Sequence, residues 1–165
     1  MSATALRASV RRWLAPPAIV AAERAGISFS VHAYEHDPNA GSYGLEAVER
    51  LGLESARVFK TLVVEVDGKL AVAIVPAAAQ LDLKAFGGKR AALVDRTRAE
   101  RATGYVLGGI SPLGMRKPLS TTLDASAFEH ATIYVSAGRR GLELELDPRD
   151  LARLTDATMR SVARG

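Results

Sequence analysis

The sequence predicts one compact α+β domain, because two β-hairpins alternate with short amphipathic helices along 165 residues. The hairpins are expected at residues 58–75 and 131–146, where turn-forming residues separate apolar segments. No repeat, linker or low-complexity tract divides the chain, and a chain of this length is most simply one domain. We therefore expect a mixed, mostly antiparallel sheet with surrounding helices rather than a βαβ series.

The first half of the chain predicts a helix, a strand and a second helix. Apolar residues recur at helical spacing over residues 18–25 and 45–51, and a glycine suited to a C-terminal cap follows each run. Between them, apolar and polar residues alternate over 27–34, which predicts a strand with one apolar face. A turn-rich loop is expected at 37–44.

The first hairpin joins residues 58–66 and 69–75 through an Asp-Gly turn. Short helices are then expected at about 82–86 and 97–102.

The second hairpin joins residues 131–136 and 142–146. Asp147-Pro148 then begin a final helix, because aspartate caps a helix N-terminus and proline suits its first turn. Residues at helical spacing should form the inner stripe of this helix: Leu151, Leu154, Thr158 and Val162.

The N-terminal residues are interpreted as a leader. Arg11-Arg12 precede an apolar stretch, but Pro16-Pro17 interrupt it, so it is not a convincing export signal. We assign residues 1–15 to a loose basic leader and 16–165 to the folded domain. No apolar run approaches the roughly 18 residues needed to cross a bilayer, so we expect a cytoplasmic protein without a membrane partner.

The charge distribution favours a polyanionic partner. The chain carries 22 Lys+Arg and 18 Asp+Glu, for a net charge of +4. Residues 84–117 hold eight basic and two acidic side chains, so this segment carries +6 and leaves −2 for the rest. Nucleic acid would suit such a local patch, whereas a solvated arginine-rich face is the alternative.

The residue inventory excludes several kinds of active site. The chain has no cysteine, which rules out disulfides, thiol nucleophiles and thiolate metal sites. His32 and His36 are four residues apart but fall on a predicted strand, so we expect neither a metal nor another cofactor. Nothing places a histidine near Ser111 or Ser136 for a catalytic triad.

Two features can carry chemistry. Lys60 shares a predicted strand face with apolar residues, so its ammonium must reach solvent or meet an anion. Gly108-Gly109 lie in a glycine-rich run whose backbone N–H groups could form an anion nest. The run is not a phosphate-binding P-loop, because Met115-Arg116 stand where that loop has Lys and Ser or Thr.

Five blocks of sequence together resemble the YbaK/EbsC family of free-standing aminoacyl-tRNA editing domains, relatives of the editing insertion in bacterial prolyl-tRNA synthetases. The similarity extends from about Ala18 to the final helix and is strongest to Cys-tRNA(Pro)/Cys-tRNA(Cys) deacylases. The blocks occur in the order of the family, at residues 34–37, 58–62, 80–84, 103–114 and 131–141.

The resemblance implies a curved, partly barrel-like sheet and a deacylase that removes a wrong amino acid from the 3′ end of tRNA. It makes Lys60 the essential lysine and Gly108 the site glycine, and we expect the backbone N–H groups of Gly108 and Gly109 to act as catalytic oxyanion donors. It assigns the substrate contacts to Tyr34, Thr61, Ile110, Ser111, Ser136 and Glu143. The expected tRNA contacts are Lys84, Lys89, Arg90, Arg116, Lys117 and Arg139.

Two departures from the family pattern stand out. Glu143 replaces the usual aspartate, which keeps the charge on a longer arm. The stretch from Lys84 to Arg90 is shorter than the usual helix, which leaves the docking of the tRNA acceptor end open.

Three functions follow as hypotheses. The first is a deacylase for Cys-tRNA(Pro), with Cys-tRNA(Cys) as a second candidate substrate, in which either water or the substrate's own thiol attacks the ester. The second is a deacylase for another mischarged tRNA such as Ala-tRNA(Pro). The third is a non-catalytic module that binds tRNA or a synthetase, and prolyl-tRNA synthetase is a candidate partner in each case.

Overall fold

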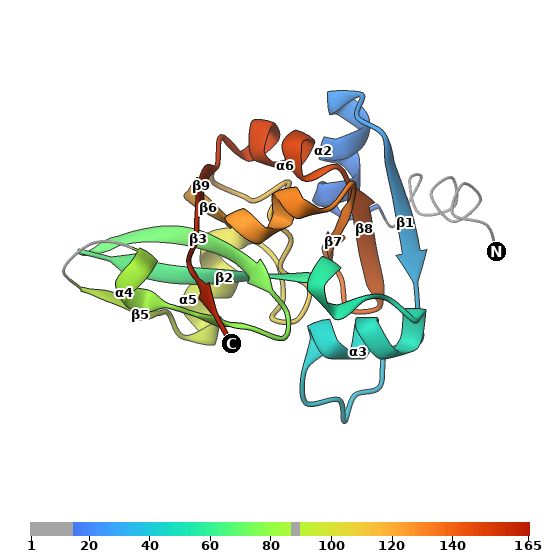
Figure 1. Ribbon diagram of the computed structural model, residues 1–165, viewed down its shortest axis with the longest axis horizontal. Coiled ribbons are helices and arrows are strands. Elements are labelled where there is room, and N and C mark those ends of the chain that lie inside the picture. Colours follow the sequence, from blue (N-terminus) through green and yellow to red (C-terminus); the bar gives the residue numbers. More distant parts are fainter. Residues whose placement is uncertain (1–14, 87–89) are drawn as a thin grey trace.

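A computed structural model describes residues 15–86 and 90–165. Its larger sheet has the order β5-β2-β3-β6-β9 (Figure 1). The hairpin of β2 and β3 is antiparallel, and Lys60 pairs with Val75. β6 and β9 join in parallel. The strands are β2 (Phe59–Val66), β3 (Lys69–Pro76), β5 (Ala91–Leu93), β6 (Ser120–Asp124) and β9 (Thr158–Arg160).

A smaller antiparallel sheet has the order β1-β8-β7. A bridge between Val58 and Tyr134 links the start of β2 to this sheet. Among the described residues the sheets do not close, so the predicted barrel-like curvature is only partial. The strands are β1 (Phe29–Ala33), β7 (Ile133–Ser136) and β8 (Leu142–Leu146), and a separate pair comprises β4 (Gln80–Leu81) and β10 (Ala163–Arg164).

Side-chain caps begin three of the helices. Ser42, Asp95 and Asp147 each accept a hydrogen bond from a backbone N–H of the first turn. Figure 1 shows α2 and α6 together on one side of the molecule and α3 on the other. The helices are α2 (Pro17–Ala25), α3 (Tyr43–Leu51), α4 (Leu83–Phe86), α5 (Arg96–Thr103) and α6 (Pro148–Thr155), and 3-10 turns occupy Ser55–Arg57 and Ala125–Glu129.

Apolar clusters cover both faces of the β2–β3 hairpin. The main core includes Phe59 and Val63 from one face of β2. A second cluster, which includes Val64 and Phe86, covers the opposite face. Lys60 has the strand parity of this second face, so its ammonium does not point into the main core.

The final helix is shorter than its periodicity predicts. It ends at Thr155, because Asp156 adopts a left-handed conformation with φ of 51°. The chain then extends, and the N–H of Val162 donates to the buried carboxylate of Asp124 at 2.8 Å. Val162 is fully buried, but it packs on the second cluster rather than on a helix stripe.

The sequence pattern does not predict strand β6. Residues 121–124 are all buried, so this strand shows no alternation between a polar and an apolar face. The predicted leader falls almost wholly on residues 1–14, outside the described residues. Within the described ranges, no helix is long and apolar enough to cross a membrane.

Candidate active site

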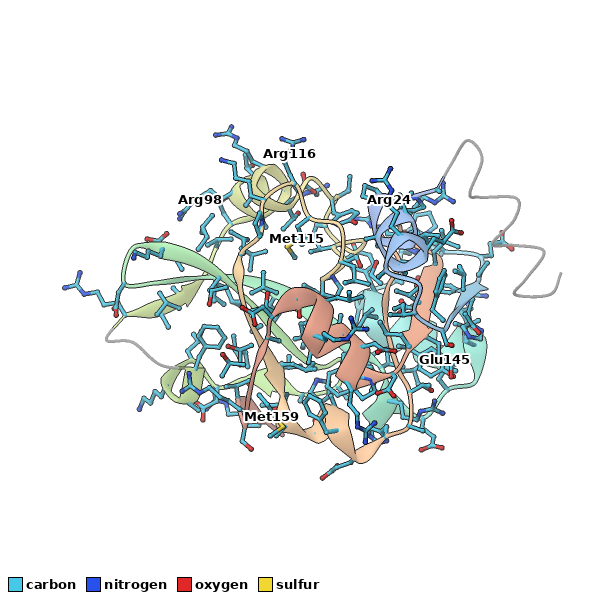
Figure 2. The ribbon with its side chains drawn as sticks, turned by 90° about the horizontal axis from the view of Figure 1, so that it is seen from above. Arg24, Arg98, Met115, Arg116, Glu145 and Met159 are labelled. Atoms are coloured by element: carbon cyan, nitrogen blue, oxygen red, sulfur yellow. The ribbon has the colours of Figure 1, made fainter. Side chains whose placement is uncertain are left out.

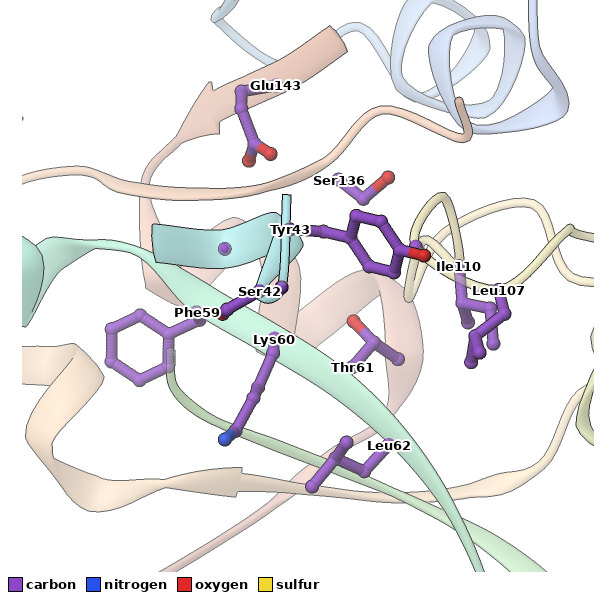
Figure 3. Close-up of a pocket in the computed structure, with 13 residues that line it drawn as sticks. Ser42, Tyr43, Phe59, Lys60, Thr61, Leu62, Leu107, Ile110, Ser136 and Glu143 are labelled. Carbon is purple, nitrogen blue, oxygen red and sulfur yellow. The ribbon is translucent and has the colours of Figure 1, made fainter. Parts of the chain in front are cut away.

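A pocket of about 230 Å³ lies where the start of α3, the first half of β2 and the loop at 107–110 meet. Ser136 of β7 and Glu143 of β8 complete its wall (Figure 3). Six of the predicted site residues therefore share one pocket. The lining comprises Gly41, Ser42, Tyr43, Gly44, Phe59, Lys60, Thr61, Leu62, Leu107, Gly108, Ile110, Ser136 and Glu143.

The alternation of β2 separates two kinds of group in this pocket. In Figure 3, Lys60 and Leu62 extend from one side of the strand, and Thr61 extends from the other, toward Ser136 and Tyr43. The hydroxyl of Thr61 is buried and has no hydrogen-bond partner in the described part of the chain. One side of the pocket thus offers a cation and the other offers neutral polar groups.

Lys60 carries a positive charge that no acidic side chain in residues 15–86 and 90–165 pairs with. Its side chain is partly buried, and burial lowers the pKa of its ammonium. No described residue forms an ion pair with it. A partly desolvated, unpaired cation is suited to an anionic ligand or to an oxygen that gains negative charge.

Glu143 is a buried acid that also lines the pocket. It is 6% exposed, and it lies between His32 of β1 and Ser136 of β7 in the strand register. Its Oε2 atom has no hydrogen-bond partner among the described residues, and burial raises the pKa of the carboxyl to about 8. At neutral pH the group is mainly a protonated acid that can donate a hydrogen bond to a ligand.

Glu143→Gln should change how stability depends on pH. The native state holds a proton on Glu143 that the unfolded chain loses above about pH 4.5, so this residue makes the free energy of unfolding fall from about pH 4.5 to about pH 8. Glutamine does not titrate, so the variant should match the wild type near pH 5 and exceed it near pH 9. Urea unfolding of both proteins across this range measures the difference, and a difference independent of pH would refute the assignment.

Tyr34, a predicted substrate contact, is not among the residues that line the pocket. Burial and the carboxylates of Glu143 and Glu46 raise the pKa of its phenol to about 12. Its backbone N–H donates to the carbonyl of Gly141 at 2.9 Å. Nearby, Glu46 accepts a bond of 2.7 Å from His36 and another of 2.8 Å from the N–H of Asp37. These two hydrogen bonds hold the loop that leads to Tyr43.

The two glycines differ in role. Gly108 lines the pocket with φ of 89°, and a Cβ there would lie 2.7 Å from both Arg140 Nε and the Tyr43 ring. Gly109 does not line the pocket. Its N–H donates to the carbonyl of Val106 at 2.8 Å, so in this conformation it is not free to bind an oxyanion.

The other predicted substrate contacts also divide. Ile110 and Ser136 line the pocket, and the hydroxyl of Ser136 accepts a bond from the N–H of Gly138 at 3.1 Å. Ser111 is fully buried outside the lining, where its hydroxyl accepts a bond from the N–H of Leu113 at 3.3 Å. Its contacts indicate a structural role in the loop.

The predicted tRNA contacts lie on more than one part of the surface. Figure 2 shows Arg116 extending from the same side of the molecule as Arg98. Lys84 lies on α4, which packs on the face of β2 from which Lys60 extends. Lys89 lies outside the described residues. The exposed positions are Lys84, Arg90, Arg116, Lys117 and Arg139.

Ion pairs reduce the free positive charge of residues 84–117. Arg96 pairs with Glu100 at 3.1 Å, and Arg98 pairs with Glu65 at 2.5 Å.

Across the described ranges, no group of three or more His, Asp and Glu side chains converges to hold a metal ion.

Sequence reasoning missed several residues of the pocket. Tyr43 and Ser42 begin α3, and the turn-rich character of 37–44 was the available signal for a binding loop. The side chain of Arg140, next to the predicted Arg139, bonds to the pocket loop: its Nε donates to the carbonyl of Leu107 at 2.9 Å. Adjacent arginines in a turn give no sequence signal for which one points inward.

Comparison with known proteins identifies the family. Residues 37–154 match the model of the aminoacyl-tRNA editing domain, a span that includes every residue of the pocket. The chain belongs to the aminoacyl-tRNA editing domain family. Its editing domain is therefore the part of the chain that forms the pocket.

Two curated relatives support this assignment. A protein of Enterococcus faecalis named "Putative Cys-tRNA(Pro)/Cys-tRNA(Cys) deacylase EbsC" is 42% identical over 114 residues, which are 66% of this chain and 69% of that protein. YwhH of Bacillus subtilis is 29% identical over 115 residues, 67% of this chain and 73% of that protein.

A solved structure supports the fold. The crystal structure of "a putative trans-editing enzyme for prolyl tRNA synthetase" superposes with a TM-score of 0.79 at 23% identity, over 91% of this chain and 98% of that one. At this level of identity the match establishes the shared fold alone, and it agrees with the α+β class predicted from the sequence.

Proposed function

We propose that this editing domain acts in trans as a deacylase that cleaves the ester between cysteine and tRNA(Pro). The carrying observation is the unpaired, partly buried ammonium of Lys60 in a small pocket of an editing domain. The similarity to EbsC, whose name specifies Cys-tRNA(Pro) and Cys-tRNA(Cys), supports the choice of amino acid. We place the activity in the cytoplasm, where charged tRNA is used.

The size of the pocket supports a small substrate group. Its volume of about 230 Å³ is below the roughly 300–1,000 Å³ of pockets that enclose drug-sized ligands. An aminoacyl group can enter such a pocket while the rest of the tRNA stays outside. The protonated Glu143 and the free Thr61 hydroxyl can then bind the polar atoms of the amino acid.

The chemistry needs little from the protein. An aminoacyl ester is already reactive, so the domain has to position it and stabilise negative charge on its carbonyl oxygen or on the tRNA end. Lys60 supplies the charge and the loop at Gly108 shapes the wall.

The chain has no cysteine of its own. We propose that the thiol of the substrate attacks its own ester: the S–C bond forms, the bond from the carbonyl carbon to the ribose oxygen breaks, and the thiol proton passes to that oxygen.

A panel of charged tRNAs tests this function. Purified protein should release cysteine from Cys-tRNA(Pro) faster than alanine from Ala-tRNA(Pro), with Cys-tRNA(Cys) as the second cysteine substrate. Preferred release of alanine would show that the protein is an Ala-tRNA(Pro) deacylase instead. No release from any tRNA would indicate a non-catalytic binding module. Added prolyl-tRNA synthetase should accelerate release if it delivers the substrate.

The first-formed product separates the two mechanisms. Attack by the thiol yields a cyclic thioester without oxygen from the solvent. If the first-formed product is instead free cysteine that carries heavy oxygen from labelled water, the ester is hydrolysed directly.

Binding of tRNA should weaken steeply with salt. Exposed cations such as Lys84 and Arg116 are expected to contact phosphates, and each neutralised phosphate releases counterions. With about three such contacts, affinity for uncharged tRNA should fall more than tenfold between 50 and 200 mM salt, measured by filter binding. A flat response would show that these cations face only solvent.

A further inference from the structure

Two acids interrupt the basic segment at residues 84–117. This segment carries eight basic side chains, and its only acids are Asp95 and Glu100. Each acid weakens the attraction of the segment for a polyanion, so each is expected to serve another purpose. Asp95 caps its own helix, because its carboxylate accepts a hydrogen bond of 2.8 Å from the N–H of Arg98. Glu100 lies in the middle of that helix and bonds to the pocket loop instead.

The bond from Glu100 reaches one wall of the pocket. Its Oε2 atom accepts a hydrogen bond of 2.8 Å from the N–H of Leu107. The loop that contains Leu107 supplies Leu107, Gly108 and Ile110 to the pocket lining (Figure 3). The bond from this N–H, more than any other contact, holds the pKa of the Glu100 carboxyl below its usual range. A charged side chain of α5 is therefore tied to the wall of the site.

Leu107 is held from its other side as well. Its carbonyl accepts a hydrogen bond of 2.9 Å from Nε of Arg140, in the turn between β7 and β8. The guanidinium carbon of Arg140 lies 4.4 Å from the centre of the Tyr43 ring, so a cation–aromatic stack extends this contact to α3. Glu100 and Arg140 thus bind the two polar backbone groups of one pocket residue from opposite charges on separate elements.

The loss of the Glu100 carboxylate should affect the loop more than the fold. Leu107 is exposed, so water can replace Glu100 as the partner of its N–H, and no buried donor is left unsatisfied. Water does not fix the direction of that N–H, however. The next residue, Gly108, has a φ of 89° and lines the pocket, so a change in the Leu107 peptide moves the pocket wall.

We propose that Glu100 is a positioning residue that holds the loop at Leu107 and Gly108 in the shape that accepts the aminoacyl ester. This inference rests on the proposed function, which places the ester in the pocket. The negative charge of Glu100 opposes the binding of tRNA by the surrounding cations. Its removal should therefore act in opposite directions on two measurements: tRNA should bind as tightly as before or more tightly, and the ester should be cleaved more slowly.

Three variants separate the hydrogen bond from the charge. Glu100→Ala removes the acceptor and the charge, whereas Glu100→Gln removes the charge and keeps an acceptor oxygen. Asp95→Asn is the matched control, because it removes one charge from the same segment at a residue that bonds to its own helix, and asparagine also caps helices. Glu100→Ala should release cysteine from Cys-tRNA(Pro) about tenfold more slowly, the effect of losing one bond to a charged acceptor. Glu100→Gln should keep most of the activity, and Asp95→Asn should react as the wild type.

Two further measurements are independent of turnover. In filter binding, all three variants should bind uncharged tRNA at least as tightly as the wild type. In amide hydrogen exchange followed by NMR, the Leu107 N–H should exchange faster in Glu100→Ala than in the wild type and in Asp95→Asn.

The outcomes separate the role of Glu100 from the proposed function. Faster exchange, slower release and undiminished tRNA binding in Glu100→Ala support both. Faster exchange when no protein, wild type included, releases cysteine supports the hold of Glu100 on the loop and refutes the proposed function. Equal exchange in wild type and Glu100→Ala, or an equal loss of rate in Asp95→Asn, overturns the role of Glu100. So does release by Glu100→Ala at the wild-type rate, and cysteine release by the wild type would leave the function standing.

Discussion

Replacing Lys60 with alanine should reduce cysteine release by about a hundredfold or more while the protein stays folded. Removing one group that stabilises developing charge typically costs 10²–10³ in rate, and no other described cation lines the pocket. Burial lowers the pKa of Lys60, so its charge opposes folding and its loss should not destabilise the protein. Single-turnover release from Cys-tRNA(Pro) and thermal unfolding measure the two effects.

Lys69→Ala is the matched control for this variant. Lys69 is exposed at the start of β3, in the same hairpin but outside the pocket lining. It should deacylate like the wild type. Near-normal turnover by Lys60→Ala would remove Lys60 from the mechanism. An equal loss of activity in Lys69→Ala would mean that the effect comes from the overall positive charge of the protein and not from the position of Lys60.

Gly108→Ala should cost about tenfold to a hundredfold in activity. A Cβ at this position would lie 2.7 Å from Arg140 Nε and from the ring of Tyr43, so the stack and the pocket wall must both shift. The φ of 89° adds strain for any residue with a side chain. Small displacements of positioning groups can reduce rate by about a hundredfold. Steady-state kinetics with Cys-tRNA(Pro) measures the loss.

Gly26→Ala introduces backbone strain without displacing any group of the pocket. Gly26 has a φ of 68°, and a Cβ there would meet nothing within 4 Å. It caps α2 and does not line the pocket, so this variant should lose stability through backbone strain alone, without losing activity. Equal activity losses in the two glycine variants would mean that Gly108 acts only through stability.

The elements that sequence predicted correctly are those with local signals. The Asp-Gly turn of the first hairpin and the Asp147 cap of α6 depend on neighbours in the chain, and the structure confirms both. The end of α6 was wrong because Val162 happens to fall at helical spacing from Leu151, whereas long-range contacts with Asp124 set its real position. The buried strand β6 lacks a periodic pattern and depends on parallel pairing with β3.

The site was predictable only in part, for the same physical reason. Lys60 and Gly108 stand in recognisable blocks of sequence, and the structure brings both into one pocket. Tyr43 and Arg140 meet through tertiary contact between α3 and the turn after β7, which no local pattern encodes. The state of Glu143 was equally inaccessible, because its raised pKa follows from burial beneath the pocket and not from its neighbours in sequence.

Single-turnover deacylation of Cys-tRNA(Pro), run beside Pro-tRNA(Pro), tests the central claim most directly. The pocket should discriminate the amino acid while the tRNA stays the same. We predict rapid release of cysteine by the wild type, slow release by Lys60→Ala, and intact Pro-tRNA(Pro) in both reactions. Persistence of Cys-tRNA(Pro) with the wild type, or equal loss of both amino acids, would contradict the account.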